Sequence, residues 1–131
     1  MSDESRWSQE RKLASLEPDF QNRVLAVLDR LKAAGFQPHI VFAWRSKETQ
    51  KKLVERGVSK TIHSKHCHGQ EGWGLAADIV DERHWWGAGD DQDESQALVF
   101  FGALGLAALE EGLGWGGTWS WKDWAHIEAK T

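Results

Sequence analysis

The sequence contains one cysteine in 131 residues, which excludes an intramolecular disulfide framework and fits synthesis in a reducing compartment. It has no excess of basic residues: the formal net charge is −4 and the isoelectric point is about 5.8. Nothing therefore indicates a nucleic-acid binder. No apolar run has the length of a membrane span, and the polar segment 1–12 lacks the hydrophobic stretch of a signal peptide. We expect synthesis in the cytoplasm without a signal peptide, and no stable membrane association.

Tyrosine is absent, whereas the chain has nine tryptophans. Five of them lie between Trp85 and Trp121, in segments that resemble loops rather than a helical stripe. Packing in the core and under loops is the ordinary explanation for such residues. The alternative is an aromatic cleft wall for a sugar or peptide ligand.

Hydrophobic periodicity and turn residues predict a single domain over residues 1–131, with residues 1–5 frayed. The patterns predict helices over 7–16, 18–34, 46–56 and 94–111, and strands over 39–44, 75–80 and 124–129. Long loops are expected over 58–73, 84–91 and 112–120. Because the helices are grouped first and the strands are spaced among later loops, the fold class is α+β.

The helix predicted over 94–111 has two notable features. Asp93 and Gln96 form a capping-box pattern at its start. Its apolar residues are distributed over nearly the whole circumference of the helix, which predicts that the helix is buried on every side.

A stretch from His63 to Asp81 concentrates imidazoles and glycines and then enters a buried strand that carries Asp78. An isolated carboxylate in a buried strand is costly unless something pairs with it, and a divalent cation is one such partner. A histidine upstream and His126 near the C-terminus could share that cation. Two histidines and one aspartate around an open fourth position are typical of catalytic zinc.

The pattern Ser64-x-His66, Gly74-x-Ala76-x-Asp78 and Asp123-x-x-His126 resembles the zinc D-Ala-D-Ala carboxypeptidase and L-alanyl-D-glutamate endopeptidase family. That family includes D-alanyl-D-alanine dipeptidases and many phage endolysins. The resemblance covers roughly residues 18–129. It implies a small antiparallel sheet packed with helices, an α+β fold shared with the hedgehog signalling domain.

The resemblance also implies roles for individual residues. His66, Asp78 and His126 would bind Zn²⁺, and Asp123 would be the general base. Arg45 and Ser64 would contact the substrate, Arg45 by gripping a substrate carboxylate, which its planar guanidinium can do with two hydrogen bonds. These assignments predict one metal-activated water as the nucleophile.

The sequence departs from the family pattern between the first histidine and the aspartate. Eleven residues separate His66 from Asp78, whereas the family usually has six. A five-residue insertion within 67–73 restores the match and keeps His66 as the ligand. His68 is the rival ligand, and an alignment without a gap places Glu71 at the position of the family's histidine. Glu128, two residues after His126, is a candidate partner for a ligand histidine and, with Glu71, an alternate base.

These observations predict a zinc-dependent peptidoglycan peptidase that hydrolyses a stem-peptide bond, most simply L-alanyl-D-glutamate. A D-alanyl-D-alanine carboxypeptidase or dipeptidase is the alternative within the class. A zinc-bearing cell-wall-binding module without activity is less consistent with Asp123, because a binder has no use for a general base. A metal-free interaction domain is the third possibility. By similarity to endolysins we expect a monomer that reaches the cell wall through a phage membrane pore.

Overall fold

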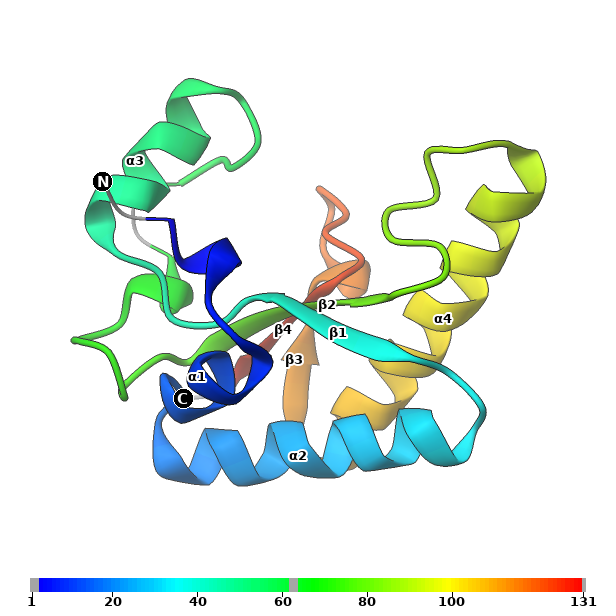
Figure 1. Ribbon diagram of the computed structural model, residues 1–131, viewed down its shortest axis with the longest axis horizontal. Helices are drawn as coiled ribbons and strands as arrows, with labels where there is room; N and C mark the ends of the chain where they lie inside the picture. Colours follow the sequence, from blue (N-terminus) through cyan, green and yellow to red (C-terminus); the bar gives the residue numbers. More distant parts are fainter. Residues whose placement is uncertain (1–2, 62–63, 131) are drawn as a thin grey trace.

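The computed structural model describes residues 3–61 and 64–130 and shows an α+β fold with one antiparallel sheet (Figure 1). The helices are α1 (Gln9–Ala14), α2 (Pro18–Ala33), α3 (Lys47–Glu55) and α4 (Asp91–Glu110). The strands are β1 (Pro38–Phe42), β2 (Ala76–Asp81), β3 (Leu113–Trp115) and β4 (His126–Ala129), in the spatial order β1-β2-β4-β3. Single 3₁₀ turns are η1 (Glu4–Arg6), η2 (Lys65–Cys67) and η3 (Gly116–Thr118). The predicted fold class is confirmed.

Helix α2 begins and ends where the sequence indicates. Pro18 occupies the first helical position, and the Glu17 carboxylate accepts hydrogen bonds from the first free backbone N–H groups. Gly35 follows the helix with a φ of 92°, a left-handed conformation that glycine adopts without a steric cost. The apolar side of α2 is buried through Phe20, Val24, Val27, Leu28 and Leu31.

The sheet has one face in the hydrophobic core and one face that carries polar groups. Helix α2 contacts β1, α4 contacts β2 and β3, and the two helices contact each other. Side chains alternate along a strand, so Ala77 and Ile79 of β2 enter this core while Asp78 lies on the opposite face. The polar face is where the functional residues gather.

Helix α4 differs from its prediction in two ways. It is not buried all round: Leu106 is 65% exposed and Val99 is 59% exposed, whereas Phe100 and Leu104 are buried. The reason is that α4 packs against the sheet and α2 on one side only. Its cap is Asp90, which accepts from the Asp93 backbone N–H, because Asp93 itself accepts from Gly89 and from the His84 ring.

The prediction of a frayed N-terminus is wrong for the part that the structure describes, which starts at residue 3. Glu4 is buried, and its carboxylate accepts a hydrogen bond of 2.9 Å from the Ser46 backbone N–H at the start of α3. Trp7 stacks on Trp44 with ring centroids 6.1 Å apart. Ser8 then caps α1, which is shorter than predicted. These contacts join the first residues to the segment that carries Arg45.

Strand β3 lies inside the segment predicted to be a loop. Leu113–Trp115 pairs with β4, opposite Ala129 to Ile127. The Trp115 ring fills the space beside Gly105 of α4, where an added Cβ would lie 2.4 Å from a ring carbon. The glycine therefore sets how closely the helix approaches the edge of the sheet. Within residues 3–61 and 64–130, no helix combines the length and hydropathy needed to cross a bilayer.

Candidate metal centre

The register of the sheet places Asp78 beside His126. The two residues are direct partners in the antiparallel pair of β2 and β4, so their side chains project from the same face. A β-bulge between Ile40 and Phe42 in β1 shifts the register so that Phe42 lies opposite Asp78. Residues far apart in the chain thus meet at one point of the polar face.

A single 3₁₀ turn brings the third residue to this point. The Ser64 hydroxyl accepts from the His66 backbone N–H at 3.1 Å and caps η2. The His66 ring donates through Nδ1 to the Ala43 carbonyl oxygen at 2.7 Å. This hydrogen bond fixes the tautomer and turns the Nε2 lone pair toward Asp78, whose Oδ2 is 3.3 Å away.

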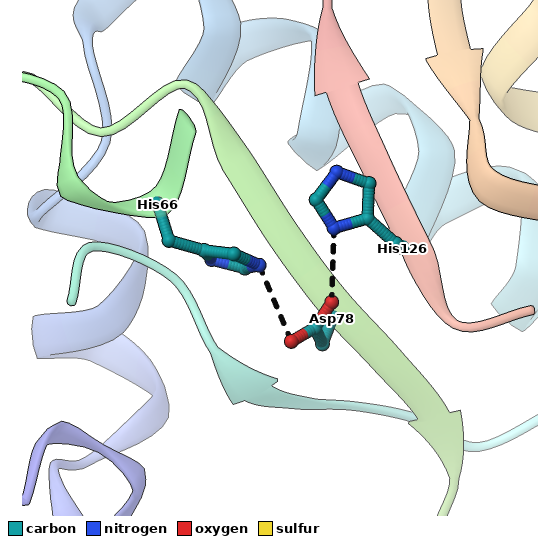
Figure 2. Close-up of side chains that lie close together, drawn as sticks. All are labelled: His66, Asp78 and His126. Atoms are coloured by element: carbon teal, nitrogen blue, oxygen red, sulfur yellow. Dashed lines mark ion pairs between the residues drawn. The ribbon is translucent and has the colours of Figure 1, made fainter. Parts of the chain in front are cut away.

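Figure 2 shows both imidazoles pointing at the carboxylate, His66 toward one oxygen and His126 toward the other. His126 Nδ1 is 3.3 Å from Asp78 Oδ1, and one ligand atom from each of His66, Asp78 and His126 lies within 4.8 Å of the others. Ligands of a tetrahedral zinc ion are separated by about 3.3 Å, given bond lengths near 2.0–2.1 Å. The spacing of these atoms therefore fits a small divalent cation.

Two buried atoms of the cluster support the same conclusion. His66 Nε2 and Asp78 Oδ1 form no well-aligned hydrogen bond to any residue in 3–61 or 64–130. Buried polar atoms in native proteins are almost always satisfied, so each such atom requires an explanation. Coordination of a metal ion would satisfy both, and the donor set of two imidazoles and one carboxylate is one that zinc accepts.

The neighbouring side chains hold the cluster in place. Glu128 accepts from His126 Nε2 at 2.8 Å and pairs with Lys65 at 2.9 Å. Metal-binding histidines commonly donate their second ring N–H to a carboxylate or a carbonyl, which fixes the ring and raises its basicity. His66 has the carbonyl of Ala43 and His126 has the carboxylate of Glu128, so both rings are oriented in this way.

Arg45 also contacts the Asp78 carboxylate. The side chain is buried and donates through one terminal nitrogen to Asp78 Oδ2 at 3.0 Å and through the other to Gln50 at 2.6 Å. Its guanidinium also lies over the Phe42 ring, 4.0 Å from the centroid. The substrate contact expected for Arg45 remains a prediction, because in this structure both terminal nitrogens are engaged by the protein.

The electrostatics of the cluster follow from burial and mutual charge. Burial lowers the pKa of His66, and the charge of Arg45 acts in the same direction. Burial would also lower the pKa of His126, but its contacts with Asp78 and Glu128 outweigh that effect and raise it to about 9. Burial opposes ionisation of Asp78 as well, yet the two histidines and Arg45 hold its pKa well below the ordinary value. The carboxylate is therefore ionised, as a metal ligand must be.

Asp123 lies at the edge of the cluster. Its Oδ2 is 3.9 Å from His126 Nδ1. Its backbone N–H donates to the Gly116 carbonyl, and a Cβ on Gly116 would lie 2.2 Å from the Asp123 carbonyl oxygen, so only glycine permits this approach. Burial and the charge of Asp78 raise the pKa of Asp123 to about 6, although His126 and Arg45 act in the opposite direction. A carboxyl group with a pKa near neutrality is suited to take up and release a proton.

The structure separates two of the alternate residues, His68 and Glu71, from the cluster. The His68 ring is exposed and contacts the Trp73 carbonyl, while Glu71 forms a bidentate pair with Arg11. The segment 67–73, where the sequence suggested an insertion, is held against α1 in this way. Sequence reasoning missed Gln50 and the Ala43 carbonyl, because a neutral amide side chain and a backbone carbonyl carry no sequence signal for a metal site.

The cluster opens into a cleft of about 750 Å³. Three exposed or half-exposed tryptophans line it, which are Trp86, Trp119 and Trp121. Trp119 contacts the His126 ring with centroids 4.9 Å apart. The aromatic cleft wall considered from the sequence is therefore present beside the candidate metal site, whereas other tryptophans, such as Trp115, pack internally.

No family model matches the sequence, and no curated protein is significantly similar to it. Among solved structures, the crystal structure of the Serratia marcescens L-Ala D-Glu endopeptidase ChiX is similar to this one. The TM-score is 0.64, the sequence identity is 26%, and the alignment covers 93% of this chain and 86% of that chain. The similarity extends over nearly the whole chain and supports a peptidase.

Proposed function

We propose that this protein is a zinc-dependent peptidase of peptidoglycan, and that it hydrolyses the L-alanyl-D-glutamate bond of the stem peptide. The buried cluster of His66, Asp78 and His126 at the base of an open cleft is the observation that supports this proposal most directly. The similarity to an L-Ala D-Glu endopeptidase supports the choice of bond.

The protein's contribution to the metal site is a rigid set of three ligands. His66 and His126 would bind through Nε2 and Nδ1, because their other nitrogens donate to Ala43 and Glu128. Asp78 would bind through an oxygen while Arg45 retains its hydrogen bond to the carboxylate. A zinc ion with three protein ligands keeps a position open, polarises a carbonyl group and lowers the pKa of water to about 7.

Asp123 is proposed as the group that moves protons in the cleft. Peptide hydrolysis requires one group to accept a proton from the attacking water and to return it to the departing amine. Asp123 lies 3.9 Å from His126 and is not one of the three candidate ligands; unlike Glu128, it is not hydrogen-bonded to that histidine. Its raised pKa allows both protonation states near neutral pH.

Digestion of purified peptidoglycan tests the proposal. Mass spectrometry of the products should show new C-terminal L-alanine and new N-terminal D-glutamate. Release of terminal D-alanine instead would assign the protein to the carboxypeptidase or dipeptidase reaction. If the zinc-loaded protein binds the cell wall but cleaves no bond, the protein is a binding module. As a control, chelation should abolish cleavage, and added Zn²⁺ should restore it.

A further inference from the structure

Three lysine or arginine side chains line the cleft in the part of the chain that the structure describes, and two of them are paired with acidic groups of the protein. Arg45 donates to Asp78 and Gln50. Lys65 pairs with Glu128 at 2.9 Å and donates to the Ala129 carbonyl at 2.6 Å. The third is Lys60, whose side chain is exposed and makes no ion pair with any described residue.

The Lys60 ammonium is nevertheless held in place. It lies 5.2 Å from the ring centroid of Trp121, which itself is exposed and lines the same cleft. A cation over the face of an indole ring is attracted by about 0.5–1 kcal/mol at an exposed site. Lys60 belongs to the segment after α3, and Trp121 to the segment before β4, so the contact joins two walls of the cleft.

The charge of the cleft determines what this cation can do. Asp78 and Glu128 line the cleft but are already paired with Arg45 and Lys65, so these four groups offer little net charge to an anionic substrate group. A glutamyl residue has two carboxyl groups, and when one is in the peptide chain the other is a free anion. A basic group that is not already neutralised by the protein is suited to bind such a carboxylate.

We propose that Lys60, positioned by Trp121, binds the free carboxylate of the glutamyl residue that follows the scissile bond. The proposal rests on the proposed function, because it assumes a glutamyl substrate. It assigns specificity to a residue outside the metal cluster and separates two tasks: Arg45 holds the metal-site carboxylate, and Lys60 holds the substrate carboxylate.

The test compares two synthetic stem peptides that differ in one group. One contains L-Ala-D-Glu with the free carboxylate, and the other has that carboxylate replaced by a carboxamide. Lys60→Met should raise KM for the acidic peptide roughly 10-fold, at the lower end of the value of a hydrogen bond to a charged group, with kcat within about 2-fold. KM for the amidated peptide should be unchanged by the substitution.

Three further variants sharpen the result. Lys60→Arg retains the charge and should keep most of the preference for the acidic peptide over the amidated one. Trp121→Leu removes the ring that positions Lys60 and should reduce that preference in part. Lys51→Met removes the same charge from the exposed side of α3 and should have no effect. Zinc content and circular dichroism should be unchanged in all of them.

The outcomes separate this inference from the proposed function. Binding of both peptides is also measured by calorimetry on an Asp123→Asn background, where turnover is slow. If the wild-type enzyme cleaves neither peptide, the proposed function fails. If Lys60→Met weakens binding of both peptides equally, or of neither, Lys60 does not recognise the carboxylate.

Discussion

The two faces of the sheet differ in what stabilises their buried side chains. On the helix side, Ala77 and Ile79 of β2 are buried among apolar side chains, where shape and volume decide the fit. On the cleft side, Asp78 is held among two imidazoles and a guanidinium. Burial stabilises the first face directly, whereas on the second face it is unfavourable unless each charge has a partner.

This difference predicts which measurements each face controls. Substitutions on the helix side should change the free energy of unfolding and leave the turnover of the folded protein unchanged. Substitutions on the cleft side should change metal content or turnover more than stability. The first three variants below test that separation, and the fourth tests a buried charge outside the cluster; the largest expected effect comes first.

His66→Ala removes a proposed ligand and should abolish both metal binding and activity. The reason is that a site with two remaining ligands loses most of its affinity for zinc. Elemental analysis and peptidoglycan turbidity assays measure the two effects together. His68→Ala, two residues away on the exposed loop, is the matched control and should retain both; the opposite result would assign the metal to His68.

Asp123→Asn preserves size and most hydrogen bonding but cannot take up a proton. The rate should fall by roughly 10²–10⁴, the usual contribution of general acid–base catalysis, with the effect on kcat rather than KM. Zinc content and the melting temperature should stay near the wild-type values. Loss of zinc would instead make Asp123 a ligand, and full activity would transfer the role of base to Glu128, the other carboxylate beside His126. Asp29→Asn, on the exposed side of α2, controls for the change of charge.

Ile79→Ala creates a cavity in the core, on the strand position next to Asp78. It should reduce the free energy of unfolding by about 2–5 kcal/mol, as measured by urea denaturation. The activity per folded molecule should change little, because the side chain faces α2 and α4 rather than the cleft. Val99→Ala on the exposed side of α4 should cost much less. A large fall in kcat for Ile79→Ala would show that the two faces are coupled.

Asp81→Asn tests a buried charge that lies outside the metal cluster. Burial opposes ionisation of Asp81, but hydrogen bonds from the Arg83 backbone and side chain outweigh it and lower the pKa. A depressed pKa adds stability above the unfolded value near 4, and this stability is lost as the pH falls through the folded pKa. The variant should be less stable by about 1–2 kcal/mol at pH 7. That deficit should shrink in denaturation curves below pH 4.

The sequence predicted local features better than pairings between distant segments. Helix α2 was correct at both ends because Pro18 and Gly35 act on their own neighbours. Strand β3 was missed because Leu113–Trp115 is too short to show an alternating pattern and contains a glycine. Only its pairing with β4 makes it a strand. The buried position of Glu4 was missed for the same reason, since its partner Ser46 lies on a different element.

The candidate site shows the same division. The structure brings together His66, Asp78 and His126, which the spacing of the motifs had grouped. It also gives Glu128 the expected contact with a ring nitrogen, because alternation along a strand is a local rule. The contact of Arg45 with Asp78 could not be predicted, because it joins two segments 33 residues apart.

The positions of the metal-site residues also bear on how the protein folds. Residues 66, 78 and 126 are separated by 12 and 48 positions, so the site closes two loops of the chain. Joining β2 to β4 is a non-local step, which is slow because loop-closure entropy is lost before the contact forms. A metal ion therefore has no preformed local pair of ligands on which to nucleate folding. We therefore expect the hydrophobic face of the sheet to assemble first, and the proposed metal ion to add stability to a domain that is already folded.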